Sequence, residues 1–242
     1  YTNSIDELAR FIQNHHLTIY SPGAIMTSAG VLFPEIRTKV EKVFKAPIFN
    51  NYGSREAGGI ACNCEKNEGL HLIPNIHYVE ILEADTKEVN TGESGEIIVT
   101  LLTNYTMPLI RYRIEDRGIL SKKVCSCGRG FPLLKKVEGR IPDMFKNKQG
   151  DLIGSGYFVS LIYSRDYVKK LQIIQKKVNY IVINLVLKDN QKIQEAKKDF
   201  KNINKKIRLV MGNETKIKYN IVDEIKPSPS GKHMYSYSKI SN

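Results

Sequence analysis

The chain has 242 residues, of which 41% are hydrophobic and 26% are charged, a composition typical of a folded globular protein. One large domain or two modest domains fit this length. The longest apolar run, Tyr180 to Leu187, is far shorter than the roughly 20 residues that a membrane-spanning helix needs, so we expect no membrane partner. Four cysteines are too few for a disulfide scaffold at this length.

Basic residues outnumber acidic ones by 37 to 25, which gives a formal charge of +12. This excess fits either a solvated lysine-rich surface or attraction to polyanions, which include nucleic acids and phosphorylated small molecules. The absence of a long basic run disfavours nucleic acid. The chain opens on Tyr1, and no secretory signal follows, so the sequence predicts a cytoplasmic protein and a fragment of a longer chain.

Two helices are expected near the start. Ser4-Ile5-Asp6-Glu7 predicts a capping box for a helix that turns Leu8, Phe11 and Ile12 inward. Pro34 predicts the start of a second helix that runs to Phe44, because a missing amide is harmless in a first turn. The apolar positions of this second helix recur at helical spacing: Ile36, Val40 and Phe44.

A β-rich region follows between residues 71 and 120. Runs such as His77 to Leu82 and Gly95 to Leu101 alternate with turn residues such as Asn90-Thr91-Gly92. This alternation predicts a meander or a small barrel. A domain boundary is expected near Gly139.

The remainder predicts a compact α+β unit, so the expected fold class is α/β plus α+β. The expected domains are residues 1–139, the end of a larger domain, and residues 140–242, a small mobile domain. The elements expected in the second part are strands at Tyr167 to Gln175 and Tyr180 to Leu187, a helix at Gln191 to Phe200, and strands at Ile207 to Met211 and Thr215 to Glu224.

Four short motifs could carry chemistry. Asn51 to Glu56 forms a strand that enters a glycine-rich loop, which is either a ligand site or a tight turn. Tyr112 to Asp116 ends a strand on a carboxylate. Glu138 to Asp143 places an arginine beside a glycine at the expected boundary, where it could reach an anion or form a linker ion pair. Lys232 follows Ser230-Gly231 on a terminal loop.

The order and spacing of these motifs resemble those of the adenylate-forming superfamily. The resemblance is greatest to the phenylacetate-coenzyme A ligase branch and its CapK-type relatives of capsular polysaccharide biosynthesis. It extends from about Ile25 to the end of the chain. It implies an AMP-forming acid-thiol ligase that uses ATP and magnesium, a small carboxylic acid, and coenzyme A or another acyl acceptor.

The resemblance also implies a role for individual residues. In Tyr52-Gly53-Ser54-Arg55-Glu56 the tyrosine corresponds to the ring that stacks on adenine, and Glu56 corresponds to the magnesium-binding carboxylate. Asp116 corresponds to the aspartate that accepts both ribose hydroxyls. Arg140 corresponds to an arginine that faces phosphate and ribose, and Lys232 to the lysine that stabilises charge during adenylation. The backbone that lines the adenine pocket corresponds to Ser28, Ala29 and Gly30.

Three positions depart from the family pattern. Arg55 stands where the family has threonine or serine, Glu115 where it has glycine, and Pro142 where it has the pivot aspartate or lysine. Proline fixes φ and is expected to stiffen the pivot. The family's phosphate-binding loop is not present after Tyr1, so we expect this chain to bind nucleotide weakly on its own.

The cysteines form two matching pairs, Cys62 with Cys64 and Cys125 with Cys127. Four thiolates from two loops could close a structural tetrahedral zinc site, and the alternative is four reduced thiols. His71 or His77 could replace one thiolate, although both are expected to be ordinary sheet residues.

The leading hypothesis is therefore ATP-dependent carboxylate activation followed by acyl transfer. The alternative is a zinc-stabilised basic module that binds nucleic acid, and it predicts salt-sensitive binding. A third possibility is a homologue that keeps the fold without turnover, to which the departures at Arg55, Glu115 and Pro142 point.

Overall fold

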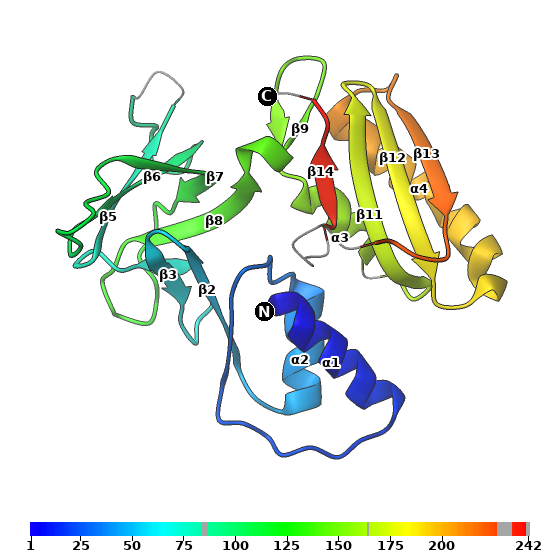
Figure 1. The fold of residues 1–242 in the computed structure, drawn as a ribbon, viewed down its shortest axis with the longest axis horizontal. Coiled ribbons are helices and arrows are strands. Elements are labelled where there is room, and N and C mark those ends of the chain that lie inside the picture. The colour runs from blue at the N-terminus through cyan, green and yellow to red at the C-terminus, as the bar shows by residue number, and fades with distance from the viewer. Residues whose placement is uncertain (84–86, 164, 227–233, 241–242) are drawn as a thin grey trace. The chain divides into compact units, whose positions relative to one another are not determined.

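The computed structural model describes residues 1–83, 87–163, 165–226 and 234–240 (Figure 1). The chain divides into two compact units, Tyr1–Val137 and Glu138–Asn242. The division lies inside strand β8 (Leu133–Arg140), slightly before the expected boundary. The assignment of these units as the end of a nucleotide-binding domain and a small mobile domain stays a prediction.

Helix α1 (Thr2–Asn14) begins earlier than its sequence predicts. Tyr1 is the N-cap residue and Ser4 lies inside the helix, so the expected capping box is wrong. The cause is a tertiary contact at the helix start. The amide of Thr2 donates to the carbonyl of Ser28 at 3.3 Å, and its hydroxyl donates to the carbonyl of Gly30 at 3.2 Å. The first bond satisfies the amide of Thr2, and the second anchors the start of the helix in place of a side-chain cap.

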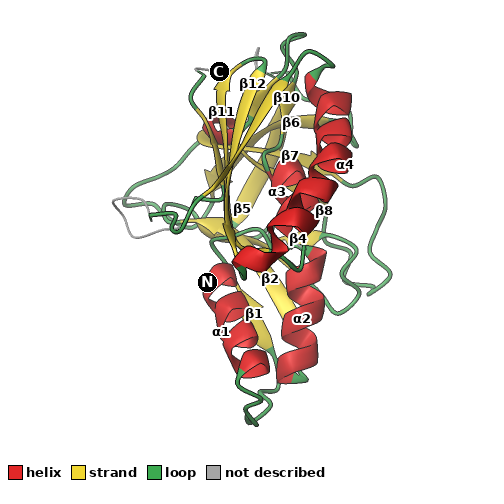
Figure 2. Ribbon diagram, turned by 90° about the vertical axis from the view of Figure 1, so that its right-hand side faces the viewer, coloured by secondary structure: helices red, strands yellow, loops and turns green. Residues whose placement is uncertain are grey.

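The inward face of α1 agrees with the prediction at Ile12, which is buried, and differs at two other positions. Leu8 and Phe11 are 47% and 52% exposed, whereas Asp6 is 1% exposed. Asp6 is buried because Arg10 and Lys39 both form ion pairs with its carboxylate, at 3.0 and 2.5 Å. Helix α2 (Pro34–Phe44) confirms the second predicted helix, with Ile36, Val40 and Phe44 buried. The two helices lie side by side (Figures 1 and 2).

The first unit holds a mixed eight-stranded sheet in the order β1-β2-β3-β4-β8-β7-β6-β5. Strands β1 and β2 pair in parallel, and the neighbours from β2 to β3, β3 to β4, β4 to β8, β5 to β6 and β6 to β7 are antiparallel. Within the described residues the sheet is open, so the meander prediction describes it better than the closed barrel. The remaining strands are β1 (Ile25–Thr27), β2 (Ile48–Ser54), β3 (Gly58–Asn63), β4 (Leu70–Leu72), β5 (His77–Leu82), β6 (Ser94–Leu101) and β7 (Tyr112–Leu120).

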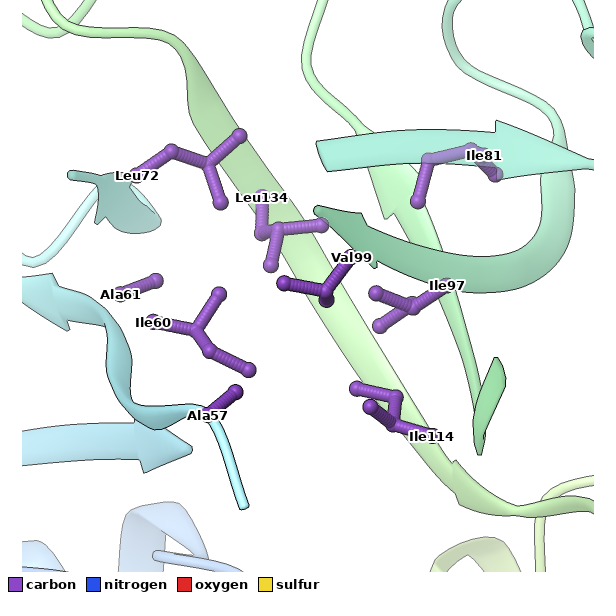
Figure 3. Packing of buried hydrophobic residues seen from close by; sticks show 9 residues of the cluster. All are labelled: Ala57, Ile60, Ala61, Leu72, Ile81, Ile97, Val99, Ile114 and Leu134. Atoms are coloured by element: carbon purple, nitrogen blue, oxygen red, sulfur yellow. The ribbon is translucent and has the colours of Figure 1, made fainter. Parts of the chain in front are cut away.

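An apolar cluster holds the strands of this sheet in place (Figure 3). Its nine members are Ala57, Ile60, Ala61, Leu72, Ile81, Ile97, Val99, Ile114 and Leu134. Each fully buried isoleucine or leucine contributes about 1.5–3 kcal/mol relative to an exposed one. Tyr52 packs against the cluster from β2, and Tyr112 from β7. The cluster therefore fixes the two strands that carry the candidate site.

The second unit contains a four-stranded sheet in the order β13-β12-β11-β14, with α3 and α4 on one side of it (Figure 2). The predicted strand at Ile207 to Met211 is wrong, because these residues form the last turns of α4. Ile203, Ile207 and Met211 are buried and recur every four residues, which is helical spacing. The elements are η1 (Ile141–Asp143), β9 (Phe145–Lys146), β10 (Leu152–Ile153), α3 (Gly156–Tyr163), β11 (Val168–Lys177), β12 (Tyr180–Leu187), η2 (Asn190–Lys192), α4 (Ile193–Met211), β13 (Lys216–Ile221) and β14 (Ser236–Ser238).

Among the described residues, no helix combines the length and the apolar character that crossing a bilayer requires.

Candidate functional site

Tyr52 and Asp116 meet in the first unit. The phenol of Tyr52 donates a hydrogen bond of 2.8 Å to Oδ2 of Asp116. Both side chains are half-buried, and they lie 64 residues apart in the chain. β2 and β7 are not neighbours in the sheet, so the sheet must curve for these side chains to touch. The structure thus brings together two residues that the resemblance assigns to one nucleotide.

A bulge in β7 carries Asp116. Glu96 pairs with Arg117 and Ile98 pairs with Arg113, so the segment from Ile114 to Asp116 faces the single residue Ile97. Such a bulge changes the direction of the following side chains. At its centre Glu115 has a φ of +63°, a left-handed conformation that favours glycine. This conformation explains why a glycine suits the position at which the resemblance places one.

An ion pair lies on one side of the bulge. Arg113 donates to both carboxylate oxygens of Glu96, with Nε to Oε1 at 2.9 Å and Nη2 to Oε2 at 2.5 Å. Glu96 is 6% exposed, and its hydrogen bonds raise the pKa of Arg113 above its usual range. This bidentate pair joins β6 to β7 just before Asp116.

A tight turn follows Tyr52. A Cβ atom added to Gly53 would lie 2.0 Å from the carbonyl oxygen of Gly58, so only glycine fits there. The hydroxyl of Ser54 accepts a hydrogen bond of 3.1 Å from the amide of Ala57, which closes the turn. Glu56 lies in this turn with an exposed side chain. The sequence motif therefore builds a hairpin whose tip presents the Glu56 carboxylate.

Ala29 and Gly30 follow β1, at the end of the sheet where β2 also ends. β1 and β2 are parallel, with Thr27 paired to Asn50, so the carboxyl ends of both strands meet there. Ala29 has a φ of +61° and is exposed. This edge is where open α/β sheets place ligands.

Arg140 belongs to the second unit, and Lys232 lies outside the described residues. Arg140 is the exposed last residue of β8, and it follows Gly139, whose φ is +112°. Lys232 falls in the segment 227–233, which the structure does not describe. The roles expected for both residues stay predictions.

A second group of side chains gathers in the first unit. The ligand atoms of Cys64, His71, Cys125 and Cys127 all lie within 4.8 Å of one another. We call this group the Cys/His cluster. The Sγ atoms of Cys64 and Cys125 are 3.6 Å apart, and Nε2 of His71 is 3.4 Å from Sγ of Cys127. The four side chains offer three sulfurs and one nitrogen, which is a donor set that Zn²⁺ prefers.

The cluster differs in one member from the predicted set of four cysteines. Cys62 is not a member, and its thiol lies within β3, 3.4 Å from the carbonyl of Asn63. His71 takes its place. His77 is an ordinary sheet residue, since its Nε2 lies 2.7 Å from the carbonyl oxygen of Ala57. His71, which the sequence offered as a possible replacement for one thiolate, lies on β4, the strand paired with β3.

Backbone amides surround the sulfurs. The amide of Lys66 donates to Sγ of Cys64 at 3.4 Å. The amide of Arg129 and, in addition, its guanidinium lower the pKa of Cys127 to about 7, although burial opposes them. Amides directed at sulfur favour the thiolate, which is the form that binds a metal.

Comparison with known proteins places this fold in a class. Residues 145–239 match the model of the CapK C-terminal domain. Protein CapK of Staphylococcus aureus is 26% identical over 247 residues, which cover 99% of this chain and 52% of that protein. A phenylacetate-coenzyme A ligase of Thermus thermophilus is 32% identical over 113 residues, which cover 45% of this chain and 25% of the ligase. The chain therefore spans about half the length of CapK.

A solved structure matches the fold as well. A 2-hydroxyisobutyryl-CoA ligase in a postadenylation state, in complex with R3-HIB-AMP, superposes with a TM-score of 0.71 at 20% identity. The match covers 91% of this chain and 49% of the ligase. The fold is that of the adenylate-forming ligases. By sequence, the chain is similar to CapK over nearly its whole length and to a phenylacetate-coenzyme A ligase over 45% of it.

Proposed function

We propose that this chain supplies the adenosine-binding residues of a ligase that activates a carboxylic acid with ATP. The observation that carries the proposal is the pair formed by Tyr52 and Asp116, which lies at one site on the fold of adenylate-forming ligases. Fold alone does not fix an activity, whereas the chemistry of the residues at this site does favour one. The similarity to a phenylacetate-coenzyme A ligase favours this function over the nucleic-acid-binding alternative.

Asp116 suits a ribose. An ionised carboxylate accepts hydrogen bonds from two hydroxyls at once, and the phenol of Tyr52 already shows that Asp116 accepts from a hydroxyl. The ring of Tyr52 offers an aromatic face for an adenine base. Gly53, Ser54, Ala29 and Gly30 supply small side chains and backbone around the same strand ends. These residues are proposed to hold the adenosine part of ATP.

Glu56 suits a magnesium ion. It is an exposed carboxylate at the tip of the hairpin that begins with Tyr52, and Mg²⁺ takes hard oxygen donors. In ligases of this chemistry the ion, when bound, neutralises charge on the phosphates of ATP. This chain would contribute the Glu56 carboxylate, held within a short turn.

The proposed reaction has two steps, activation of the acid and transfer of its acyl group. A carboxylate oxygen of the acid attacks the α-phosphorus of ATP, the bond from that phosphorus to the bridging oxygen breaks, and pyrophosphate leaves. Lys232 is proposed to stabilise the negative charge that develops at the α-phosphate, and Arg140 to contact phosphate and ribose. The acyl group of the adenylate then passes to coenzyme A or another acceptor, with AMP as the leaving group.

Exchange of labelled pyrophosphate into ATP tests the activation step. The natural protein that carries this sequence is given a panel of aryl, fatty and hydroxy acids, and exchange is expected with at least one of them. Lys232→Ala is expected to slow exchange by about 100-fold or more, as expected for loss of a charge that contacts the transition state. Lys226→Ala is the matched control, because Lys226 is an exposed lysine close to Lys232 in the chain. Equal exchange rates in the two variants would remove Lys232 from catalysis.

A further inference from the structure

We propose that the Cys/His cluster binds one Zn²⁺ through Cys64, His71, Cys125 and Cys127, in a closed tetrahedral site that stabilises the first unit. The proposal is independent of the ligase function, because it depends on other residues. It takes up the alternative in which His71 replaces a thiolate, and the thiolate replaced is that of Cys62.

The spacing of the ligand atoms fits a tetrahedron around zinc. Zinc bonds of about 2.3 Å to sulfur and about 2.0 Å to nitrogen place two sulfurs about 3.8 Å apart, and a sulfur and a nitrogen about 3.5 Å apart. The corresponding distances are 3.6 Å between Cys64 and Cys125 and 3.4 Å between Cys127 and His71. A disulfide would require its two sulfurs to lie about 2.05 Å apart, so the cluster is not a disulfide.

The donors favour zinc over harder ions. Thiolate and imidazole ligands select Zn²⁺ or other soft metals, whereas magnesium and calcium require oxygen. Three of the four residues are buried, with exposed fractions of 7% for Cys64, 6% for His71 and 4% for Cys125. With all four positions filled by protein, the metal has no open site for water or substrate. The site is therefore structural.

The surroundings of the cluster support a charged metal centre. Three thiolates and one Zn²⁺ would carry a net charge of −1, and Arg129, two residues after Cys127, carries a positive charge. Glu65 in turn holds Arg129 through an ion pair of 3.0 Å. Glu68 accepts hydrogen bonds from the amide and hydroxyl of Ser126, at 2.9 and 2.7 Å, which fixes the residue between Cys125 and Cys127. Partners of this kind orient metal ligands.

The metal would join two separate loops. Cys64 lies just after β3 and His71 lies on β4, while Cys125 and Cys127 lie between β7 and β8. Asn63, next to Cys64, accepts a hydrogen bond from the amide of Asn50 on β2. A zinc ion would thus tie the loop before β8 to the hairpin that carries Tyr52.

Thiol labelling and metal analysis test the site on the natural protein. Purified protein is expected to contain about one zinc per chain and, with zinc bound, to react with an alkylating reagent at Cys62 but not at Cys64, Cys125 or Cys127. Removal of zinc with a chelator should make all four thiols reactive. Equal labelling of the four thiols with and without added zinc would overturn the proposal.

Variants separate the two ligand sets. His71→Ala and Cys127→Ser are expected to lower zinc content by about 5-fold or more, and Cys62→Ser is expected to retain full zinc content. Loss of zinc from the Cys62 variant would support four cysteines as the ligands and would overturn the set that contains His71. If the His71 variant does not fold, cobalt titration of the wild-type protein decides. Intense tetrahedral absorption with sulfur-to-metal charge transfer supports the site, and its absence contradicts the site.

Discussion

The hydroxyl of Tyr52 lies 2.8 Å from Oδ2 of Asp116, which connects two strands that are not adjacent in their sheet. A hydrogen bond to a charged group contributes about 1.5–3 kcal/mol when buried, and less when half-buried. A double-mutant cycle with Tyr52→Phe and Asp116→Asn should therefore give a coupling energy of about 1 kcal/mol in urea unfolding. Strictly additive effects would show that the bond does not stabilise the fold.

Glu115 occupies a left-handed conformation at the centre of the β7 bulge. A side chain in this conformation costs about 1 kcal/mol relative to glycine. Glu115→Gly is therefore expected to raise the free energy of unfolding by about that amount, less the added freedom of the unfolded chain. Glu115→Ala is the control and should give no comparable gain. A lower stability for the glycine variant than for the alanine variant would contradict the account of this bulge.

Gly53 has no room for a side chain, because an added Cβ would lie 2.0 Å from a backbone carbonyl oxygen of Gly58. Gly53→Ala must shift the hairpin and should lower the free energy of unfolding by about 2–4 kcal/mol. Gly23→Ala is the matched control, since a Cβ at Gly23 meets nothing within 4 Å. Thermal unfolding gives the melting temperatures of the two variants. Similar melting temperatures would contradict the claim that Gly53 has no room for a side chain.

Removal of zinc should destabilise the first unit, because a ligand that binds only the folded state adds to its stability. A chelator is expected to lower the melting temperature by about 5 °C or more. Cys62→Ser should show the same decrease, whereas Cys127→Ser should already melt low and respond little to the chelator. A wild-type melting temperature that does not respond to metal would argue against a structural ion.

Local sequence patterns predicted some elements well. Helix α2 was predicted from Pro34 and an apolar residue every fourth position, and the structure confirms it. The prediction failed at Ile207, where β-branched residues suggested a strand although the spacing of Ile203, Ile207 and Met211 is helical. It also failed at the start of α1, because the contact of Thr2 with Gly30 depends on residues 28 positions away.

The candidate sites, too, depend on contacts between residues that are distant in the chain. Sequence spacing selected Tyr52 and Asp116 as members of separate motifs, but their contact depends on the curvature of the whole sheet. Cysteine pairing predicted Cys62 as a ligand because it is close to Cys64 in the chain. The choice of His71 depends on how β3, β4 and the loop before β8 pack together, which no local pattern contains.

Measurement of the KM for ATP in the exchange reaction tests the central claim most directly. If Asp116 holds the ribose, Asp116→Asn should raise the KM for ATP by about 10-fold to 100-fold, because charge-assisted hydrogen bonds of about 1.5–3 kcal/mol are lost. Tyr52→Phe keeps the aromatic ring and leaves the Asp116 carboxylate in place, so it should change the KM for ATP much less. Asp223→Asn, at an exposed position, is the control. A KM for ATP that is the same in the Asp116 variant, the control and the wild type would contradict the proposed nucleotide site.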